Sequence, residues 1–423
     1  MSRTKQKYDI VIIGAGPAGL AAAISAKENG AEDVLLIERL DCLGGILQQC
    51  IHPGFGLKKF RLDLTGPEYA KKYIDSFLKL KIDYLLDTCV LEVTPFKKVL
   101  VTSPTTGLKT LEAGSIIFAM GCRERTRANL NIFGDRPAGI FTAGTAQRLV
   151  NIEGLMVGKE IIILGSGDIG LIMARRCKFE GADVKAVIEI RPEPSGLNRN
   201  VQQCLIDYGI PLYLKHTVFK ICGSKRIERV FFGQVDENMG QVSGTEKEMK
   251  CDTLLLSAGL IPESELILKA GIKINPLTGG PVTDNIFQTS RNGFFACGNV
   301  VQVYDLVDSV SEAGHLAGKA AALYTAGKLP RARTRVKLAG RKPVGNIVPQ
   351  YYRDYFIGKD KDLISLRVDR KVEKPKFMIK DKDEILACIR KPYAVPSEMT
   401  ILDISKYKQK MLKRTELVIE VKG

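Results

Sequence analysis

The chain has 423 residues, with 45% hydrophobic and 26% charged residues, which is typical of a soluble globular protein of two or three domains. No apolar run is long enough to cross a bilayer, so a membrane-spanning helix is excluded. Ten cysteines without Cys-x-x-Cys spacing and only three histidines argue against a disulfide scaffold and against a metal site. The same cysteine usage predicts a reducing, cytoplasmic location.

The positive charge is concentrated near the end of the chain. The net charge is +16, and from Lys328 onward 25 Lys and Arg stand against 12 Asp and Glu. This excess is interpreted either as a solvated surface or as the footprint of an acidic partner or a membrane surface. No nucleic-acid-binding motif accompanies it, so we expect no nucleic acid and leave peripheral membrane association open.

The first predicted elements form a strand, a glycine turn and a helix. An apolar run at 10–13 precedes Gly14-Ala15-Gly16-Pro17-Ala18-Gly19, a GxGxxG fingerprint, and Glu38 stands 19 residues after its last glycine. The first glycine permits a sharp turn, the second lets backbone amides approach a pyrophosphate, and the third allows close packing of helix on strand. The acid can accept hydrogen bonds from ribose hydroxyls.

A second helix is predicted after this unit. Thr65, Pro67 and Glu68 match an N-terminal capping box with proline in the first turn. The apolar residues at 73, 74, 77 and 78 would form its buried face. Strands are expected at 83–87, 88–93, 98–101 and 116–119, the last ending in Met120-Gly121-Cys122-Arg123.

The fingerprint then repeats with the same spacing. Gly165-Ser166-Gly167-Asp168-Ile169-Gly170 follows an apolar run at 161–164, and Glu189 again stands 19 residues after the last glycine. Helices are predicted at 201–208 and at 305–325. Strands are predicted at 212–215, 229–233 and 253–257, with a hairpin at 236–245 and a strand followed by a turn at 293–299. Beyond residue 331 the chain carries short β-type runs such as 376–380 and 385–389. We therefore predict an α/β fold with two Rossmann-like domains and a small β-rich C-terminal domain.

With these motifs, residues 8–327 resemble the two-dinucleotide-binding-domain flavoproteins, the superfamily of glutathione reductase and thioredoxin reductase. The resemblance implies that the first fingerprint binds FAD and the second binds NAD(P)H. It further matches Leu43-Gly44-Gly45 to a glycine turn beside FAD, Ala119-Met120-Gly121 to the ATG turn, and Phe294-Phe295-Ala296-Cys297-Gly298-Asn299 to a late flavin motif. The implied FAD residues are Gly14, Gly16, Pro17, Ala18, Gly19, Glu38, Arg39, Gly44, Gly45, Gln49, Val90, Gly121, Gly298 and Asn299. The implied NAD residues are Gly165, Gly167, Asp168, Ile169, Gly170 and Glu189.

Two departures from the superfamily bear on function. Asn299 replaces the usual aspartate, and its amide oxygen can still accept from a ribityl hydroxyl. Disulfide reductases carry a cysteine pair after the glycine turn, where this chain has Leu47 and His52 with Cys50 as the single cysteine between them. A dithiol relay is therefore not expected.

A narrower resemblance rests on the runs 44–56, 64–69 and 141–147. These look like the FAD/NAD subunits of multi-subunit dehydrogenases, namely proline dehydrogenase alpha, hydrogen cyanide synthase B, opine and sarcosine oxidase relatives, and proteins associated with glycerol-3-phosphate dehydrogenase. The resemblance implies hydride exchange between nicotinamide and FAD, with electrons passing to or from a flavoprotein subunit that acts as the dehydrogenase. Another expected partner is a small electron-transfer protein.

Alternatives remain at individual residues. Cys50 is either the thiol of a self-contained NADH oxidase or peroxidase, or a packed cysteine. His52 is either a proton-exchanging group beside the flavin or a structural hydrogen-bonding residue. The arginines at 123, 125 and 127 either contact phosphate or form a solvated face. A mainly structural role for FAD is a third reading of the whole chain.

Glu189 favours NAD because it accepts ribose hydroxyls and repels a 2′-phosphate, although Arg191 close by leaves NADP open. The expected domains are 1–125 and 259–330 for FAD, 126–258 for NAD, and the basic region 331–423 for docking.

Overall fold

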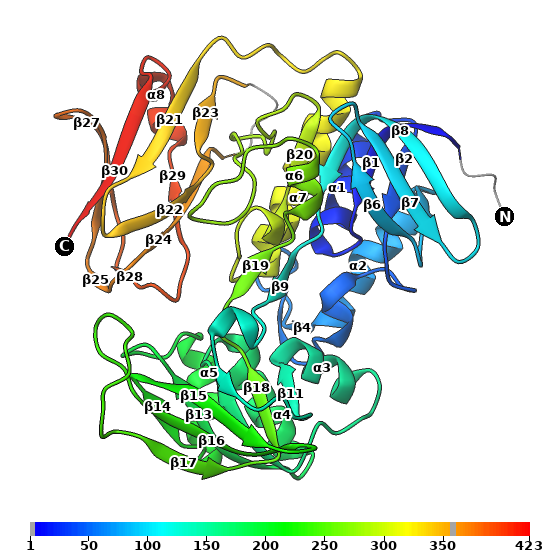
Figure 1. Ribbon diagram of the computed structural model, residues 1–423. Coiled ribbons are helices and arrows are strands. Elements are labelled where there is room, and N and C mark those ends of the chain that lie inside the picture. Colours follow the sequence, from blue (N-terminus) through cyan, green and yellow to red (C-terminus); the bar gives the residue numbers. More distant parts are fainter. Residues whose placement is uncertain (1–4, 356–360) are drawn as a thin grey trace. The chain divides into compact units, whose positions relative to one another are not determined.

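The structure is a computed structural model that describes residues 5–355 and 361–423 (Figure 1). The chain forms two units: Met1–Cys122 with Pro262–Gly423, called the first unit, and Arg123–Ile261, called the second unit. Two short strands, β9 (Cys122–Glu124) and β19 (Leu260–Pro262), pair with each other where the chain passes between the units. The second unit is therefore an insertion into the first.

The first unit contains a seven-stranded sheet in the order β5-β2-β1-β8-β7-β6, with β20 also paired to β8. The pairs β1–β2, β1–β8, β2–β5 and β8–β20 are parallel, whereas β6, β7 and β8 form an antiparallel extension. The strands are β1 (Lys7–Ile13), β2 (Val34–Ile37), β5 (Asp83–Leu85), β6 (Cys89–Val93), β7 (Lys98–Ser103), β8 (Gly107–Phe118) and β20 (Phe294–Ala296). This is a Rossmann-like order, as predicted.

Strand β8 is longer than the predicted strand at 116–119. Of its residues Gly107–Glu112 only Leu111 is buried, and all of them pair antiparallel with β7. Only Ser115–Phe118, the last four residues that pair with β1, are continuously buried. The apolar pattern therefore revealed only the buried end of the strand.

Helices α1 (Pro17–Glu28) and α7 (Val307–Thr325) pack tightly against each other. A Cβ on Gly314 would stand 2.3 Å from the Ala18 carbonyl oxygen, and one on Gly318 would stand 2.1 Å from that of Ala22. Small residues on both helices allow this approach. The contact joins segments that lie almost 300 residues apart in the sequence. It includes a hydrogen bond from the Ser25 hydroxyl to the carbonyl oxygen of His315.

Helix α2 (Gly66–Lys79) begins with the predicted capping box between Thr65 and Glu68. The predicted buried face is partly wrong. Leu78 is 44% exposed, whereas Tyr69 is fully buried. Positions 66, 69, 73 and 77 follow the helical repeat along one stripe, and residue 78 lies about 100° away from it.

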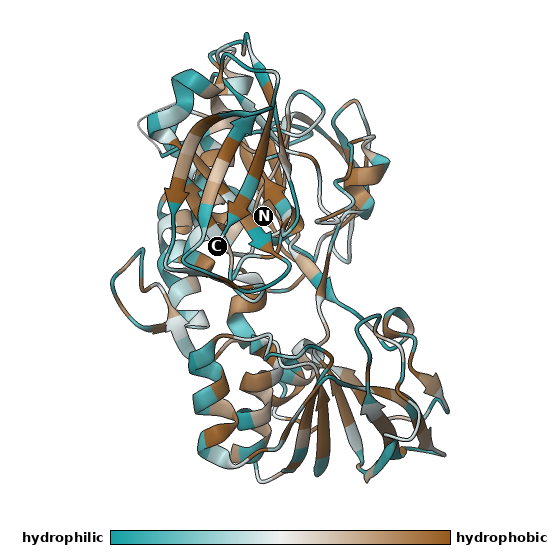
Figure 2. Cartoon of the chain, turned by 90° about the vertical axis from the view of Figure 1, so that its left-hand side faces the viewer, coloured by the Kyte–Doolittle hydropathy of each residue, from teal (hydrophilic) through white to brown (hydrophobic). Residues whose placement is uncertain are grey.

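The second unit has a five-stranded parallel sheet in the order β11-β18-β12-β13-β14. Alternate residues of its strands contribute to separate cores: Ile161 and Ile163 to one, Ile162 and Leu164 to the other. Burial on both faces explains the continuous apolar runs in the sequence, and Figure 2 shows these strands largely in brown. The elements are β11 (Ile140–Thr142), α3 (Ala143–Asn151), β12 (Glu160–Leu164), α4 (Asp168–Phe179), β13 (Asp183–Glu189), β14 (Leu212–Leu214) and β18 (Thr253–Leu256).

A four-stranded sheet in the order β10-β15-β16-β17 packs against the face of the parallel sheet that carries Ile162 and Leu164. Its strands are β10 (Phe133–Gly134), β15 (His216–Gly223), β16 (Ile227–Gln234) and β17 (Lys247–Lys250). The helix predicted at 201–208 is two pieces, α5 (Asn198–Cys204) and a 3-10 turn (Ile206–Tyr208) that ends at left-handed Gly209.

The C-terminal region is β-rich, which confirms the predicted fold class. Its sheets run β23-β21-β30-β26-β27 and β22-β24-β29 around a core of its own. A short helix, α8 (Lys408–Met411), lies between β29 and β30 in the chain. The strands are β21 (Arg335–Gly340), β22 (Val344–Val348), β23 (Tyr351–Arg353), β24 (Leu363–Val368), β26 (Lys376–Asp381), β27 (Glu384–Arg390), β29 (Thr400–Asp403) and β30 (Glu416–Lys422).

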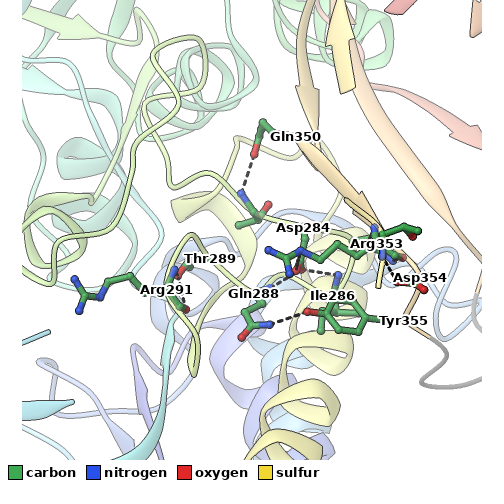
Figure 3. A network of polar contacts seen from close by, with 12 residues as sticks. Asp284, Ile286, Gln288, Thr289, Arg291, Gln350, Arg353, Asp354 and Tyr355 are labelled. Atoms are coloured by element: carbon green, nitrogen blue, oxygen red, sulfur yellow. Dashed lines mark hydrogen bonds and ion pairs between the residues drawn. The ribbon is translucent and has the colours of Figure 1, made fainter. Parts of the chain in front are cut away.

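A buried polar network fastens this region to the rest of the first unit (Figure 3). Oδ1 of Asp284 accepts hydrogen bonds from the backbone N–H groups of Ile286 (3.1 Å) and Gln288 (3.0 Å), and Oδ2 lies 3.3 Å from Nε of Arg353. Gln288 also donates to the Tyr355 hydroxyl at 3.1 Å. Tyr355 itself packs in the core that α1 and α7 share.

Among residues 5–355 and 361–423, none of the helices combines the length and the apolar character that crossing a bilayer requires.

Candidate functional site

The first fingerprint forms a tight glycine turn at the end of β1. Gly14 has a φ of 101°, and a Cβ there would stand 2.5 Å from the Ala119 carbonyl oxygen. A Cβ on Gly19 would stand 1.8 Å from the Gly14 carbonyl oxygen, whereas nothing lies within 4 Å of one on Gly16. The first and third glycines are thus required by packing, and the second leaves open space beside the start of α1.

Glu38 lies at the end of β2, buried next to this turn. Its Oε2 accepts a hydrogen bond from the Ala15 backbone N–H at 2.8 Å, and its Oε1 accepts one from the Leu40 backbone N–H at 3.0 Å. A carboxylate has about four acceptor positions. These two bonds therefore orient Glu38 and leave capacity for two further donors.

The turn at Gly44 and Gly45 lies directly against the fingerprint. The Gly44 N–H donates to the Ala15 carbonyl at 2.9 Å, and a Cβ on Gly45 would stand 2.9 Å from Cα of Gly16. Both glycines have positive φ. The structure thus brings together two motifs that the sequence separates.

The late motif joins the same place. A Cβ on Gly298 would stand 2.7 Å from Cβ of Ala18. Asn299 Oδ1 accepts from the Tyr304 backbone N–H at 3.1 Å, and its Nδ2 lies 3.8 Å from Sγ of Cys122. Gly121, directly before β9, has open space where a Cβ would point.

The other expected FAD residues lie nearby in the chain but differ in exposure. Pro17 begins α1, Arg39 is exposed after Glu38, Gln49 is buried in the 3-10 turn Gly45–Gln49, and Val90 is half-buried in β6.

Cys50 and His52 follow that 3-10 turn. The Cys50 thiol donates to the Ile46 carbonyl at 3.3 Å, and burial raises the pKa of the thiol to about 12. The His52 ring lies 3.0 Å from the Pro53 carbonyl through Nδ1 and 5.1 Å from the ring of Phe55. A raised thiol pKa is the reverse of what a nucleophilic or peroxide-reducing cysteine needs.

The second fingerprint has the same backbone geometry. Gly165 has a φ of 101°, and its Cβ would stand 2.2 Å from the Ser257 carbonyl oxygen; that of Gly170 would stand 2.6 Å from the Gly165 carbonyl oxygen. Gly167 is again the roomier glycine, with Ser257 atoms at 3.7 Å. Ser257, just beyond β18, thus plays the part that Ala119 plays beyond β8.

Glu189 is buried at the end of β13 and accepts four hydrogen bonds from the chain. Its donors are the backbone N–H groups of Ser166 (2.9 Å) and Arg191 (3.0 Å) and the hydroxyls of Ser166 (2.5 Å) and Ser195 (2.9 Å). The two serines were not predicted from the sequence. Their only local signal is a hydroxyl residue after the first glycine, where the first fingerprint has alanine.

Asp168 stands in the first turn of α4. Its Oδ1 accepts from the Leu197 backbone N–H at 2.8 Å and from the Asn200 side chain at 2.7 Å. The Asp168 carboxylate therefore anchors the segment that follows β13, and Ile169 packs beside the helical core of this unit.

Arg127 has a structural role within the second unit. Its guanidinium donates to the carbonyls of Ile132 (2.9 Å), Gly134 (2.9 Å) and Asp135. These bonds occupy three of the five guanidinium N–H donors and hold the Arg127 side chain in place. Arg125 lies against Gly259, 3.7 Å from the position of a Cβ there.

Both glycine turns fit the pyrophosphate of a dinucleotide. Each opens a helix whose N-cap residue is glycine, Gly16 for α1 and Gly167 for α4, so no side chain caps the first backbone N–H groups. Those groups and the helix dipole attract phosphate. Among the described residues, no group of three or more His, Cys, Asp or Glu is arranged to hold a metal ion.

A family model described as pyridine nucleotide-disulphide oxidoreductase matches residues 8–319. The chain belongs to this family. Its members are FAD- and NAD(P)H-dependent oxidoreductases, so the chain is a flavin- and pyridine-nucleotide-dependent enzyme. This confirms the superfamily and both cofactor classes expected from the two fingerprints.

Several known proteins are similar to it. An opine oxidase subunit from Agrobacterium tumefaciens is 23% identical over 337 residues, covering 75% of this chain and 65% of that protein. The chain thus spans slightly less than two thirds of the length of that relative.

Two solved structures share the fold. That of thioredoxin reductase from T. acidophilum has a TM-score of 0.61 and 22% identity, covering 76% of this chain and 99% of that one. That of L-proline dehydrogenase from P. horikoshii has a TM-score of 0.53 and 22% identity, covering 76% and 55%.

Proposed function

We propose that the chain is the NADH-linked subunit of a larger dehydrogenase, exchanging hydride between nicotinamide and FAD. The observation that carries this proposal is the duplicated fingerprint, in which two glycine turns of matching geometry each lie beside a buried glutamate. The first would hold FAD through Gly14, Gly16, Gly19 and Glu38. The second would hold NADH through Gly165, Gly167, Gly170 and Glu189.

When bound, the two cofactors supply the redox chemistry, and the protein fixes their position and surroundings. The turns at residues 44–45 and 298–299 close on the first fingerprint. Asn299 offers its remaining lone pair to a ribityl hydroxyl. His52 is the residue proposed to exchange a proton with the flavin.

Electrons would then pass to or from a flavoprotein subunit that acts on an amino acid or on glycerol 3-phosphate, with a small electron-transfer protein as a further component. Support comes from the relative named as an oxidase subunit, together with the single cysteine at 50, which lacks the low thiol pKa of a redox-active residue. The basic region 331–423 is the proposed docking surface. The ten cysteines, all in the described part of the chain, carry thiols rather than disulfides, which supports the cytoplasm as location.

The second candidate is a self-contained NADH oxidase or peroxidase using Cys50. The raised pKa of its thiol disfavours this candidate, because the reactive species is the thiolate. A mainly structural flavin is the third candidate, and it predicts that NADH leaves the flavin oxidised.

The test uses the purified full-length chain loaded with FAD. We expect NADH to bleach the flavin in stopped-flow measurements and artificial dyes to be reduced with NADH, without oxidation of proline, sarcosine or glycerol 3-phosphate. Efficient oxidation of one of these substrates by the chain alone would contradict the proposed role as one component of a larger enzyme. A flavin that stays oxidised would support the structural role instead. NADH-dependent peroxide turnover that disappears in Cys50→Ser would support the second candidate.

A further inference from the structure

The glutamates beside the two fingerprints are held by the same backbone frame. Each accepts one hydrogen bond on Oε2 from the residue after the first glycine and one on Oε1 from the residue two positions after itself. The distances are 2.8 and 3.0 Å for Glu38 and 2.9 and 3.0 Å for Glu189. The first site therefore serves as an internal reference for the second.

The second site differs by two serine hydroxyls. The hydroxyls of Ser166 and Ser195 donate to Oε2 of Glu189 at 2.5 and 2.9 Å, and the Ser195 backbone N–H donates to the Ser166 oxygen at 2.8 Å. Oε2 thus accepts three donors, although an oxygen of a carboxylate has about two lone pairs. Ala15 occupies the position of Ser166 in the first site and has no hydroxyl.

The segment 191–197 is fastened to the second fingerprint at its other end as well. Oδ1 of Asp168 accepts from the Leu197 backbone N–H at 2.8 Å. A Cβ on Gly196 would stand 2.9 Å from the Ser166 carbonyl oxygen and 2.8 Å from Cδ1 of Leu171. The segment therefore lies directly on the glycine turn, with Ser195 directed at the glutamate.

We propose that Ser195 is an internal competitor of the NADH ribose and determines the affinity of the second site. This inference rests on the proposed binding of NADH there. A ribose that donates both hydroxyls to Glu189 finds room on Oε1, whereas on Oε2 it must displace the Ser195 hydroxyl. Binding exchanges one hydrogen bond to the carboxylate for another, so the nucleotide gains less than it would at a site built like that of Glu38.

The competition acts on NAD and not on NADP. In NADP the 2′-hydroxyl is phosphorylated, so the ribose keeps only its 3′-hydroxyl as a donor, and Oε1 can accept that hydroxyl without displacing Ser195. The 2′-phosphate itself is repelled by the charge of Glu189 whether or not Ser195 is present. Glu189 therefore gives the site its preference for NAD over NADP, and Ser195 reduces that preference by weakening the binding of NAD.

The test is equilibrium binding of NAD⁺ by calorimetry to the full-length protein with oxidised FAD, which NAD⁺ cannot reduce. Ser195→Ala should bind NAD⁺ about three- to tenfold more tightly, the effect of one typical hydrogen bond no longer lost on binding. The same variant should bind NADP⁺ as the wild type does. Ser195→Thr keeps the hydroxyl and should resemble the wild type, and Ser243→Ala, at an exposed hairpin residue of the same unit, is the matched control.

Unchanged or weaker NAD⁺ binding by Ser195→Ala would overturn the inference, since weaker binding would make Ser195 a ribose ligand. Glu189→Ala separates this failure from failure of the proposed function. If Glu189→Ala weakens NAD⁺ binding and Ser195→Ala does not tighten it, only the competition is wrong. If Glu189→Ala leaves NAD⁺ binding unchanged, the assignment of the second site is wrong, and the inference with it.

Discussion

At the scale of single residues, the first and third glycines of the first fingerprint, Gly14 and Gly19, are required because a side chain would collide with the backbone. Gly14 combines a φ of 101° with a Cβ position 2.5 Å from a backbone oxygen, whereas Gly30 has a φ of 91° and open space around its Cβ position. An alanine at either position would adopt an unfavourable left-handed backbone, but only at residue 14 would its methyl group also collide with the backbone.

We therefore expect Gly14→Ala to abolish FAD binding, because the new methyl group pushes β1 and β8 apart where the turn begins. Gly30→Ala carries a similar conformational cost without the collision and should retain FAD. Flavin absorbance of the purified variants measures both. Retention of FAD by a folded Gly14→Ala protein would show that this turn is not where FAD binds.

Cys50 allows a prediction about reactivity. With the pKa of its thiol raised to about 12, roughly one thiol in ten thousand is ionised at pH 8. Iodoacetamide at pH 8 should modify Cys50 much more slowly than exposed Cys89 and Cys388, as followed by peptide mass spectrometry. Labelling of Cys50 ahead of these controls would revive the oxidase or peroxidase candidate.

At the scale of elements, sequence patterns predicted what short-range chemistry determines. The capping box of α2, both glycine turns and the apolar strands at 10–13 and 161–164 were all recognisable because each depends on neighbours within a few residues. The contact of Ser195 with Glu189 could not be recognised, because Ser195 lies in a surface loop without a sequence pattern. The contact of Asp284 with Arg353 could not be recognised either, because Arg353 lies in a strand much later in the chain. No periodicity in the chain encodes such pairings.

The junction between β23 and the segment 283–289 should give the stability of the protein a pH dependence. Burial raises the pKa of Asp284 to about 7, despite the Arg353 guanidinium opposite, which lowers it. The unfolded chain releases this proton near pH 4, so the stabilisation is present below that pH and is lost as the pH rises towards 7.

Asp284→Asn keeps an acceptor for the backbone N–H groups of Ile286 and Gln288 but cannot ionise. We expect thermal unfolding of the wild type to show a fall in Tm between pH 4 and 7 that is smaller in this variant. Parallel Tm profiles for the two proteins would mean that Asp284 is ionised throughout and paired with Arg353.

At the scale of the whole molecule, the basic C-terminal region is not a separable appendage. Val348 and Tyr355 belong to cores of the first unit, and Arg367 pairs with Asp305. Deleting residues 331–423 would uncover these cores, so loss of partner binding in such a variant would not identify a docking surface. Substitution of exposed charges is the cleaner experiment.

Lys406, Lys410 and Lys413 are exposed on and beside α8. Replacing all three by glutamate should weaken association with an acidic partner protein and reduce its dependence on salt. Lys79, Lys109 and Lys225, exposed elsewhere in the chain, provide a triple control of equal charge change. Co-elution with the partner at two salt concentrations tests this, and an equal loss in both triple variants would contradict docking at this region.

The contact between α1 and α7 has a consequence for synthesis on the ribosome. The alanine-rich face of α1 emerges early, yet its covering helix is translated almost 300 residues later. The sheets of the inserted second unit are formed by strands within residues 123–261. The second unit can therefore complete its sheets before the C-terminal part of the first unit has been translated. The middle of the chain is therefore the first part able to finish folding, and a nascent N-terminal third with an uncovered apolar helix is the stage at which chaperones would be most needed.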